Sequence, residues 1–255
     1  MSFYRDLGEG RFLASRHTTG PWDPASQHAG PPSALLGRAV ERTAPRDDVM
    51  VARVTVEVLG AVPVGELTVD VRVVRPGRSV ELVQATLSAA GRDVARASAW
   101  RVRRTEGASV ATRLPAPPAL PPEADRRDPE GWVEGYVQAM EWRWAAGFFA
   151  EPGPATVWGR MRYPLVEGEE PTPLQRALIV ADSGNGASSE LDPRRWWFIN
   201  PELTVHLHRE PVGEWVCLDA QTTVSEGGVG LATSVLSDTA GPFGVGAQSL
   251  LVSPR

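Results

Sequence analysis

The stretch PSALLGRAVER, residues 32–42, decides the fold, because it forms a short apolar helix directly before a set of strand-like runs. Its apolar residues have the spacing of one helix face: Leu35, Leu36, Ala39 and Val40. Pro32 is typical of a helix start. Three strand-like runs follow, at residues 50–59, 67–74 and 80–102, the last with a break predicted at Gly91-Arg92. The unit is therefore one helix and then several strands.

The second half of the chain has the same order of elements. PLQRALIVAD, residues 173–182, is again a short apolar helix that begins with a proline. Four strand-like runs follow, at residues 196–207, 215–224, 229–236 and 245–252. The tetrapeptide PVGE occurs at 63–66 and at 211–214, an offset of 211 − 63 = 148, each time between the first and second strand. This shared position indicates that one unit was duplicated.

A helix followed by strands with turn-sized links is typical of an α+β layout with antiparallel neighbours. The apolar helix is expected inside the curve of its sheet, so the sequence predicts two antiparallel sheets, each wrapped around a central helix. Segment 113–131 carries six prolines, which suit a linker better than a helix or central strand. The predicted organisation is a first repeat over 1–112, this linker, and a second repeat over 132–255.

Composition excludes several function classes. With 42% hydrophobic and 22% charged residues among 255, the chain has a globular composition. All 26 basic residues are Arg, which excludes a Schiff-base lysine and a P-loop lysine. The single cysteine, Cys217, excludes an internal disulfide and a cysteine zinc cluster. The net charge of −5 gives no case for a nucleic-acid partner. Without an apolar span or a signal-peptide pattern, we expect a cytoplasmic protein with no membrane partner.

Several motifs, taken in order, carry a family resemblance. They are GPWDP at 20–24, QHAGPPSALL at 27–36, Ala181-Asp182, FINPELTVHLHR at 198–209 and Ala247-Gln248. Together they resemble the acyl-CoA thioesterase II-like (TesB-like) family, in its single-chain double-hotdog form. The resemblance implies hydrolysis of acyl-CoA or another acyl thioester, in lipid metabolism, without a covalent enzyme intermediate. It also implies a homo-oligomer, a dimer or higher, and we expect no cofactor and no metal.

Three residues carry the catalytic hypothesis. Asp182 lies at the C-terminal end of the second helix, where the macrodipole disfavours an anion. Asn200 interrupts a strand-like run, and Gln248 shares an inward strand face with Leu250 and Val252. The resemblance places the family's catalytic Asp, polar strand residue and Gln at these three positions. In the resulting hypothesis Asp182 takes a proton from a water held between Asn200 and Gln248.

The opening of the first-half helix is the predicted substrate-binding element. A helix N-terminus offers backbone N–H groups to a developing oxyanion, which assigns this role to His28, Ala29 and Gly30.

The repeat also predicts which residue of the first half corresponds to Gln248. Glu66 and Trp100 are 34 residues apart, as are Glu214 and Gln248, so Trp100 is expected to fill the pseudo-symmetric second site.

Other interpretations stay open. Asp23 and His28 have the Asp-x4-His spacing of hotdog enoyl-CoA hydratases, although the Asn-Pro inside that motif is missing. A non-catalytic acyl-thioester-binding protein is a further alternative, because a fold does not prove an activity. His206 and His208 share a strand face that suits a metal, without a third ligand at a recognisable spacing. No Gly-x-Ser-x-Gly elbow occurs, which argues against a serine hydrolase.

Each of these residues also has a purely structural explanation. Asp182 before Ser183-Gly184 is a common helix-exit cap, and Gln248 can be satisfied by loop backbone. Five tryptophans near the second-half helix are candidates for an acyl channel or for core: Trp142, Trp144, Trp158, Trp196 and Trp197.

Overall fold

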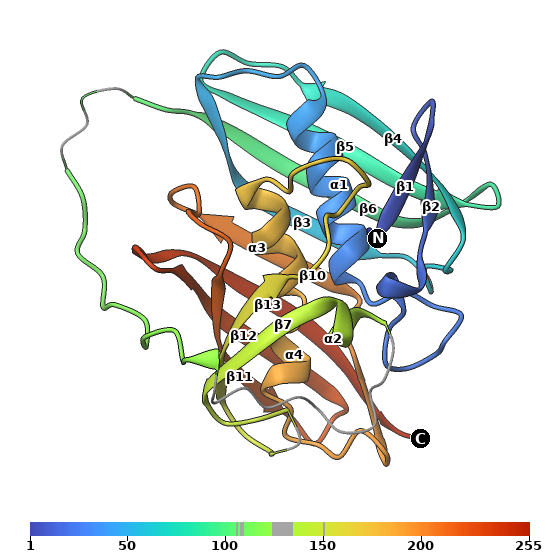
Figure 1. The fold of residues 1–255 in the computed structure, drawn as a ribbon, viewed down its shortest axis with the longest axis vertical. Helices are drawn as coiled ribbons and strands as arrows, with labels where there is room; N and C mark the ends of the chain where they lie inside the picture. Colours follow the sequence, from blue (N-terminus) through green and yellow to red (C-terminus); the bar gives the residue numbers. More distant parts are fainter. Residues whose placement is uncertain (106, 108–109, 124–134, 150) are drawn as a thin grey trace.

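A computed structural model describes residues 1–105, 107, 110–123, 135–149 and 151–255 (Figure 1). The first half contains a short 3-10 turn at Arg16–Thr18, one long helix and six strands. These are β1 (Tyr4–Gly8), β2 (Arg11–Ala14), α1 (Gly30–Arg42), β3 (Val49–Val58), β4 (Glu66–Arg75), β5 (Val80–Ala89) and β6 (Arg92–Arg103). The predicted helix and strands are confirmed, and α1 begins two residues earlier than expected because Pro31 and Pro32 occupy its first turn.

The second half repeats this order and adds two short helices. Its elements are α2 (Tyr136–Ala139), β7 (Met140–Ala146), β8 (Ala155–Met161), α3 (Pro173–Ala181), α4 (Gly184–Ala187), β9 (Trp196–Ile199), β10 (Glu202–Leu207), β11 (Val216–Val224), β12 (Val229–Asp238) and β13 (Gly241–Pro254). The run predicted at 196–207 is two strands, because Asn200-Pro201 separates β9 from β10. Proline cannot donate to a strand ladder, which explains the break.

The described strands form one sheet of 13 strands rather than the two sheets that the sequence predicted. Its order is β1-β2-β4-β5-β6-β3-β10-β13-β12-β11-β8-β7, with β9 paired to β13. The join is the antiparallel pair of β3 and β10, in which Val54 faces Val205 and Thr55 faces Thr204. Without this pair both strands would leave unpaired N–H and C=O groups at a sheet edge. The pairing therefore merges the two halves.

The two long helices lie side by side, and the strands of the sheet surround them (Figure 1). α1 packs on β3, β4, β5 and β6, while α3 packs on β8, β10, β11 and β12. They run antiparallel: Gly30 at the start of α1 lies against the carbonyl of Ile179 near the end of α3, and Glu41 bonds to Thr172 at the other end. A Cβ at Gly37 would lie 2.5 Å from Leu178, so glycine allows the close approach. This arrangement brings the start of α1 to the end of α3.

The prediction that Trp100 is the counterpart of Gln248 in the first repeat is wrong. The hairpin turns pair Ala89 with Arg92 and Asp238 with Gly241, an offset of 238 − 89 = 149 rather than 148. The residue that matches Gln248 is therefore Ala99, which is fully buried. Trp100 points to the other face of the sheet, where Arg75 lies over its ring. A shift of one residue along a strand moves a side chain to the opposite face.

The predicted linker is only partly within the described residues. Residues 113–122 carry no helix or strand, and residues 124–131 lie outside the described part. The repeat boundaries at 112 and 132 therefore stay a prediction. Within the described ranges, no helix is both long enough and apolar enough to cross a membrane.

Candidate active site

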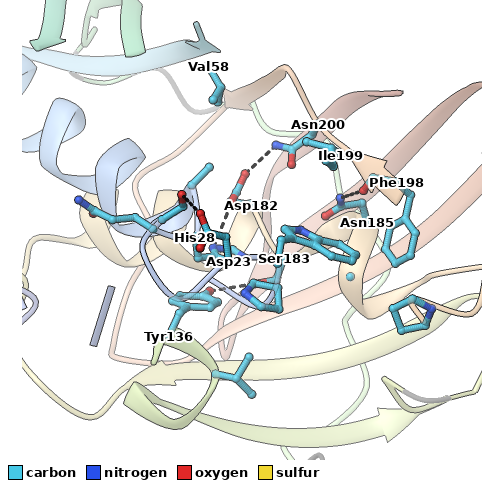
Figure 2. Close-up of a pocket in the computed structure, with 18 of the residues that line it drawn as sticks. Asp23, His28, Val58, Tyr136, Asp182, Ser183, Asn185, Phe198, Ile199 and Asn200 are labelled. Carbon is cyan, nitrogen blue, oxygen red and sulfur yellow. Dashed lines mark hydrogen bonds and ion pairs between the residues drawn. The ribbon is translucent and has the colours of Figure 1, made fainter. Parts of the chain in front are cut away.

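A cavity of about 530 Å³ opens where the two halves meet (Figure 2). Its walls come from the loop before α1, the end of β3, α2 and β7, the segment joining α3 to α4, and the end of β9. Most of the lining is apolar, and the cavity includes the rings of Trp22, Trp142, Trp144 and Trp197. Three polar side chains, Asp182, Asn200 and His28, lie in the middle of this surface. The other two tryptophans of the predicted channel, Trp158 and Trp196, do not line it.

Asp182 is the centre of the polar group. It is the C-cap of α3 and only 2% exposed, and its carboxylate accepts bonds from two side-chain amides. Asn200 Nδ2 donates to Oδ1 at 2.9 Å, and Gln248 Nε2 donates to Oδ1 at 3.3 Å and to the Asp182 carbonyl at 3.0 Å. The three residues that the sequence singled out therefore meet in space, although 66 positions separate the outer two along the chain.

Burial controls the charge of this carboxyl group. Desolvation raises the pKa of Asp182 to about 7, against the opposing effect of bonds from Asn200, Gln248 and the backbone N–H of Gly30. Near neutral pH the group therefore exists in both its acid and carboxylate forms. A carboxylate with a pKa close to the working pH is well suited to take a proton from a bound water.

Gln248 holds Asp182 from the side away from the cavity. Its side chain is 2% exposed and is not part of the cavity lining. Its Nε2 is bonded to Asp182, while its Oε1 accepts a bond from the backbone N–H of Asn185 at 3.0 Å. A Cβ at Gly184 would lie 2.8 Å from Oε1, so a larger residue there would displace this amide. These bonds orient the acid, and they differ from the predicted contact between Gln248 and a water in the cavity.

Asn200 faces the cavity directly. It stands between β9 and β10 at the position where Pro201 ends the strand ladder. Its amide Nδ2 donates both to Asp182 and to the carbonyl of Glu202, at 2.9 and 3.3 Å. The break in the strand therefore turns a polar side chain toward the carboxylate.

The predicted oxyanion element at 28–30 contributes differently from what was expected. The backbone N–H of His28 donates to the carbonyl of Thr18 at 2.8 Å, and that of Gly30 donates to His28 Nδ1 at 3.0 Å. Pro31 carries no N–H at all. Among the described residues, the N–H of Ala29 has no protein acceptor, and Ala29 lines the cavity. Of the three predicted donors, Ala29 alone keeps its N–H for a ligand.

The ring of His28 contacts the acid, which the sequence did not predict. Its Nδ1 lies 3.1 Å from Asp182 Oδ2. Because Nδ1 accepts the bond from the Gly30 N–H, the proton of this contact lies on the carboxyl oxygen of Asp182. Burial lowers the pKa of His28 to about 3, so the imidazole is neutral near pH 7. The protonated acid therefore donates to a neutral imidazole, and the pair carries no opposite charges.

Tyr136 is a further site residue that sequence reasoning missed. Its ring stacks on that of His28, with centroids 3.9 Å apart and planes 11° from parallel (Figure 2). Its hydroxyl donates to the carbonyl of Ile179 at 2.7 Å and lies 2.9 Å from Ser183 Oγ. Tyr136 thus joins His28 of the first half to the end of α3. No motif surrounds it in the sequence, so only packing reveals it.

The residues of the competing motifs have other partners in the structure. Asp23 lies in an exposed turn and accepts bonds from its neighbours Ala25 and Ser26, while the carboxylate beside His28 is Asp182. His206 and His208 have no third ligand: the described residues contain no group of three or more His, Cys, Asp or Glu side chains that would hold a metal ion.

Two family models match the chain and together cover most of it. The model described as acyl-CoA thioesterase C-terminal domain matches residues 116–252, and the model described as acyl-CoA thioesterase N-terminal domain matches residues 18–102. No sequence of a curated protein matches this chain.

Solved structures share the fold. A protein of unknown function with a hot dog fold from Alicyclobacillus acidocaldarius has a TM-score of 0.75 and 16% identity, with 98% of this chain and 96% of that chain covered. The tesB protein of Mycobacterium avium subs paratuberculosis has a TM-score of 0.69 and 17% identity, with 98% and 96% covered. The acyl-CoA thioesterase II TesB2 of Mycobacterium marinum has a TM-score of 0.67 and 14% identity, with 99% of this chain and 96% of that chain covered. At these identities they show the α+β hotdog fold.

Proposed function

The chain belongs to the acyl-CoA thioesterase family and is a thioester hydrolase, and on this premise we propose that it hydrolyses acyl-CoA with a water activated by Asp182. One observation carries the proposal: a buried carboxyl group with a pKa raised to about 7 faces an aromatic cavity. We also propose that the halves are two hotdog repeats of a double-hotdog chain, over residues 1–112 and 132–255, joined by the linker at 113–131.

The proposed reaction needs one base and no covalent intermediate. A water binds beside Asp182 and Asn200, Asp182 takes one of its protons, and the oxygen attacks the thioester carbon. The resulting tetrahedral intermediate then collapses, its carbon–sulfur bond breaks, and the leaving thiolate takes the proton back from Asp182. The products are a carboxylic acid and a free thiol, and the enzyme returns to its starting state.

Charge develops on the carbonyl oxygen during the attack. The N–H of Ala29, without an acceptor in the described part of the chain, lies at the start of α1, where the helix dipole adds positive potential. The apolar walls strengthen both effects, because a low dielectric increases the interaction between a dipole and a charge. Ala29 is therefore the donor that we assign to the oxyanion.

The activity of the enzyme is expected to rise with pH through about 7. Only the ionised form of Asp182 accepts a proton, and burial raises the pKa of this group to that value. A plot of log kcat/KM against pH should have a slope of one below the midpoint and a plateau above it. A midpoint near 4, the ordinary value for Asp, would contradict the role of the buried carboxylate.

Replacing Gln248 with Met tests whether Gln248 positions the acid. The variant loses the bond from Gln248 Nε2 to Asp182 Oδ1, which favours the carboxylate, together with the bond to the backbone carbonyl of Asp182. The midpoint of the pH profile should therefore move upward. We expect activity at pH 7 to fall by roughly tenfold and to recover at higher pH, where Asp182 ionises again. Loss of activity with an unchanged midpoint would instead mean that Gln248 binds the reacting water.

Release of free thiol from purified protein tests the function itself. Acyl-CoA thioesters from acetyl to palmitoyl should yield thiol at a rate proportional to enzyme concentration. Hydration of an enoyl-CoA without thiol release would favour the hydratase alternative, and binding without turnover would favour a non-catalytic acyl-thioester-binding protein.

A further inference from the structure

The cavity has a buried end and an exposed end, with Asp182 between them. Figure 2 shows the acid between Val58 on one side and Tyr136 on the other. On the Tyr136 side, Trp142 packs edge-on against the tyrosine ring and is 6% exposed, and Val157 of the same lining is 0% exposed. Toward Val58 the lining reaches the surface, with the neighbouring Leu59 50% exposed. A ligand whose reacting atom lies at Asp182 must therefore place one part inside and one part outside.

The chemistry of an acyl-CoA decides which part enters. Its pantetheine arm carries two amides and its nucleotide carries charged phosphates, and both would lose hydrogen bonds to water inside an apolar pocket. The acyl chain has no polar group to satisfy. The buried end offers aromatic and aliphatic side chains, so it suits the acyl chain.

Gly186 lies on the wall of this cavity and leaves open space there. It belongs to α4, and among the described residues a Cβ placed on it would meet one atom within 4 Å, Cε2 of Phe149 at 3.9 Å. Its φ is outside the left-handed region, so a larger residue is not strained by the backbone. Gly184, two residues earlier, has no such room because its Cβ would meet Gln248 at 2.8 Å. In the same short helix, Gly184 is therefore constrained by Gln248, whereas Gly186 faces open space.

We propose that Gly186 determines the length of acyl chain that the enzyme accepts. This inference rests on the proposed thioesterase function. The acyl chain extends from the thioester at Asp182 into the buried end and passes the bare backbone of Gly186, opposite Phe149. A side chain at position 186 fills the space that the distal methylenes occupy. Removal of a single methylene from an apolar pocket changes discrimination by roughly 10- to 200-fold, so even a small side chain has a measurable effect.

The test compares Gly186→Val and Gly186→Ala with Gly184→Ala on the acetyl-to-palmitoyl series. We expect Gly186→Val to lower the ratio of kcat/KM for the longest to that for the shortest accepted chain by at least tenfold, and Gly186→Ala to lower it less. Gly184→Ala, which disturbs Gln248, should reduce all lengths by the same factor.

Each other outcome has a defined meaning. A uniform loss at all lengths in both Gly186 variants, with thermal unfolding like that of the wild type, overturns the length assignment while the thioesterase function stands. If Gly186→Val does not fold, the ratio measured with Gly186→Ala decides, and an unaltered ratio overturns the assignment. Absence of thiol release from every substrate by the wild type contradicts the proposed function itself.

Discussion

Replacing Asp182 with Asn is expected to lower kcat by roughly 10²–10⁴-fold, the contribution that a general base usually makes. Asparagine has nearly the shape of aspartate and still accepts the bond from Asn200, but it does not take a proton from water. KM should change little, because the cavity walls that contact the rest of the substrate are unaltered. Thiol release under saturating acyl-CoA measures the effect, and activity close to that of the wild type would remove Asp182 from the mechanism.

The same variant has a stability signature. The folded-state pKa of Asp182 is raised from 3.8 to about 7, so the folded protein binds this proton more tightly than the unfolded chain. In the wild type this group therefore lowers the free energy of unfolding as the pH rises from about 4 to about 7. Asp182→Asn should therefore not lose this free energy of unfolding between pH 4 and pH 7. Comparing chemical denaturation curves at pH 4 and pH 7.5 gives the measurement.

Asp238 provides a matched control, since it is also buried. Burial opposes its charge, but two bonds from Arg209 and the backbone N–H groups of Val212 and Ala240 hold its pKa below the ordinary value. Asp238→Asn should therefore destabilise the protein near neutral pH, the opposite sign to Asp182→Asn. It lies outside the cavity lining, so the pH midpoint of activity should stay near 7.

Replacing Gly30 with Ala is expected to reduce kcat/KM by about 100-fold. The added Cβ would lie 2.6 Å from the carbonyl oxygen of Ile179 and 3.1 Å from His28 Nδ1. Backbone atoms cannot rotate away, so the start of α1 must move from the end of α3. That movement shifts His28 and the N–H of Ala29 relative to Asp182, and a displacement of about 1 Å in a catalytic site costs roughly 10²-fold.

Stability should fall in the same variant. Overpacking between two helices usually costs about 1–3 kcal/mol, which thermal or chemical unfolding detects. Gly65→Ala is the control, because no atom of the described residues lies within 4 Å of a Cβ there and its φ is not in the left-handed region. Wild-type activity in Gly30→Ala would mean that the contact between α1 and α3 does not set the catalytic geometry.

The sequence by itself determined the elements and three residues of the candidate site. Helical spacing at 32–42 and alternation at 67–74 reflect which faces are buried, and such periodicity is local. Asp182 at a helix end, Asn200 in a broken strand and Gln248 on an inward face each contradict a local preference, and they meet in the structure. Polar residues in unfavourable positions are visible without coordinates because their cost is local.

Only the tertiary structure decided how these parts fit together. The pairing of β3 with β10, the contact of His28 with Asp182 and the stacking of Tyr136 all join residues from different halves of the chain. The face of Trp100 depended on one extra residue between the repeats, because a strand alternates faces at every position. The raised pKa of Asp182 likewise follows from burial by both halves. Distances between remote residues are fixed by packing, which no local pattern of residues encodes.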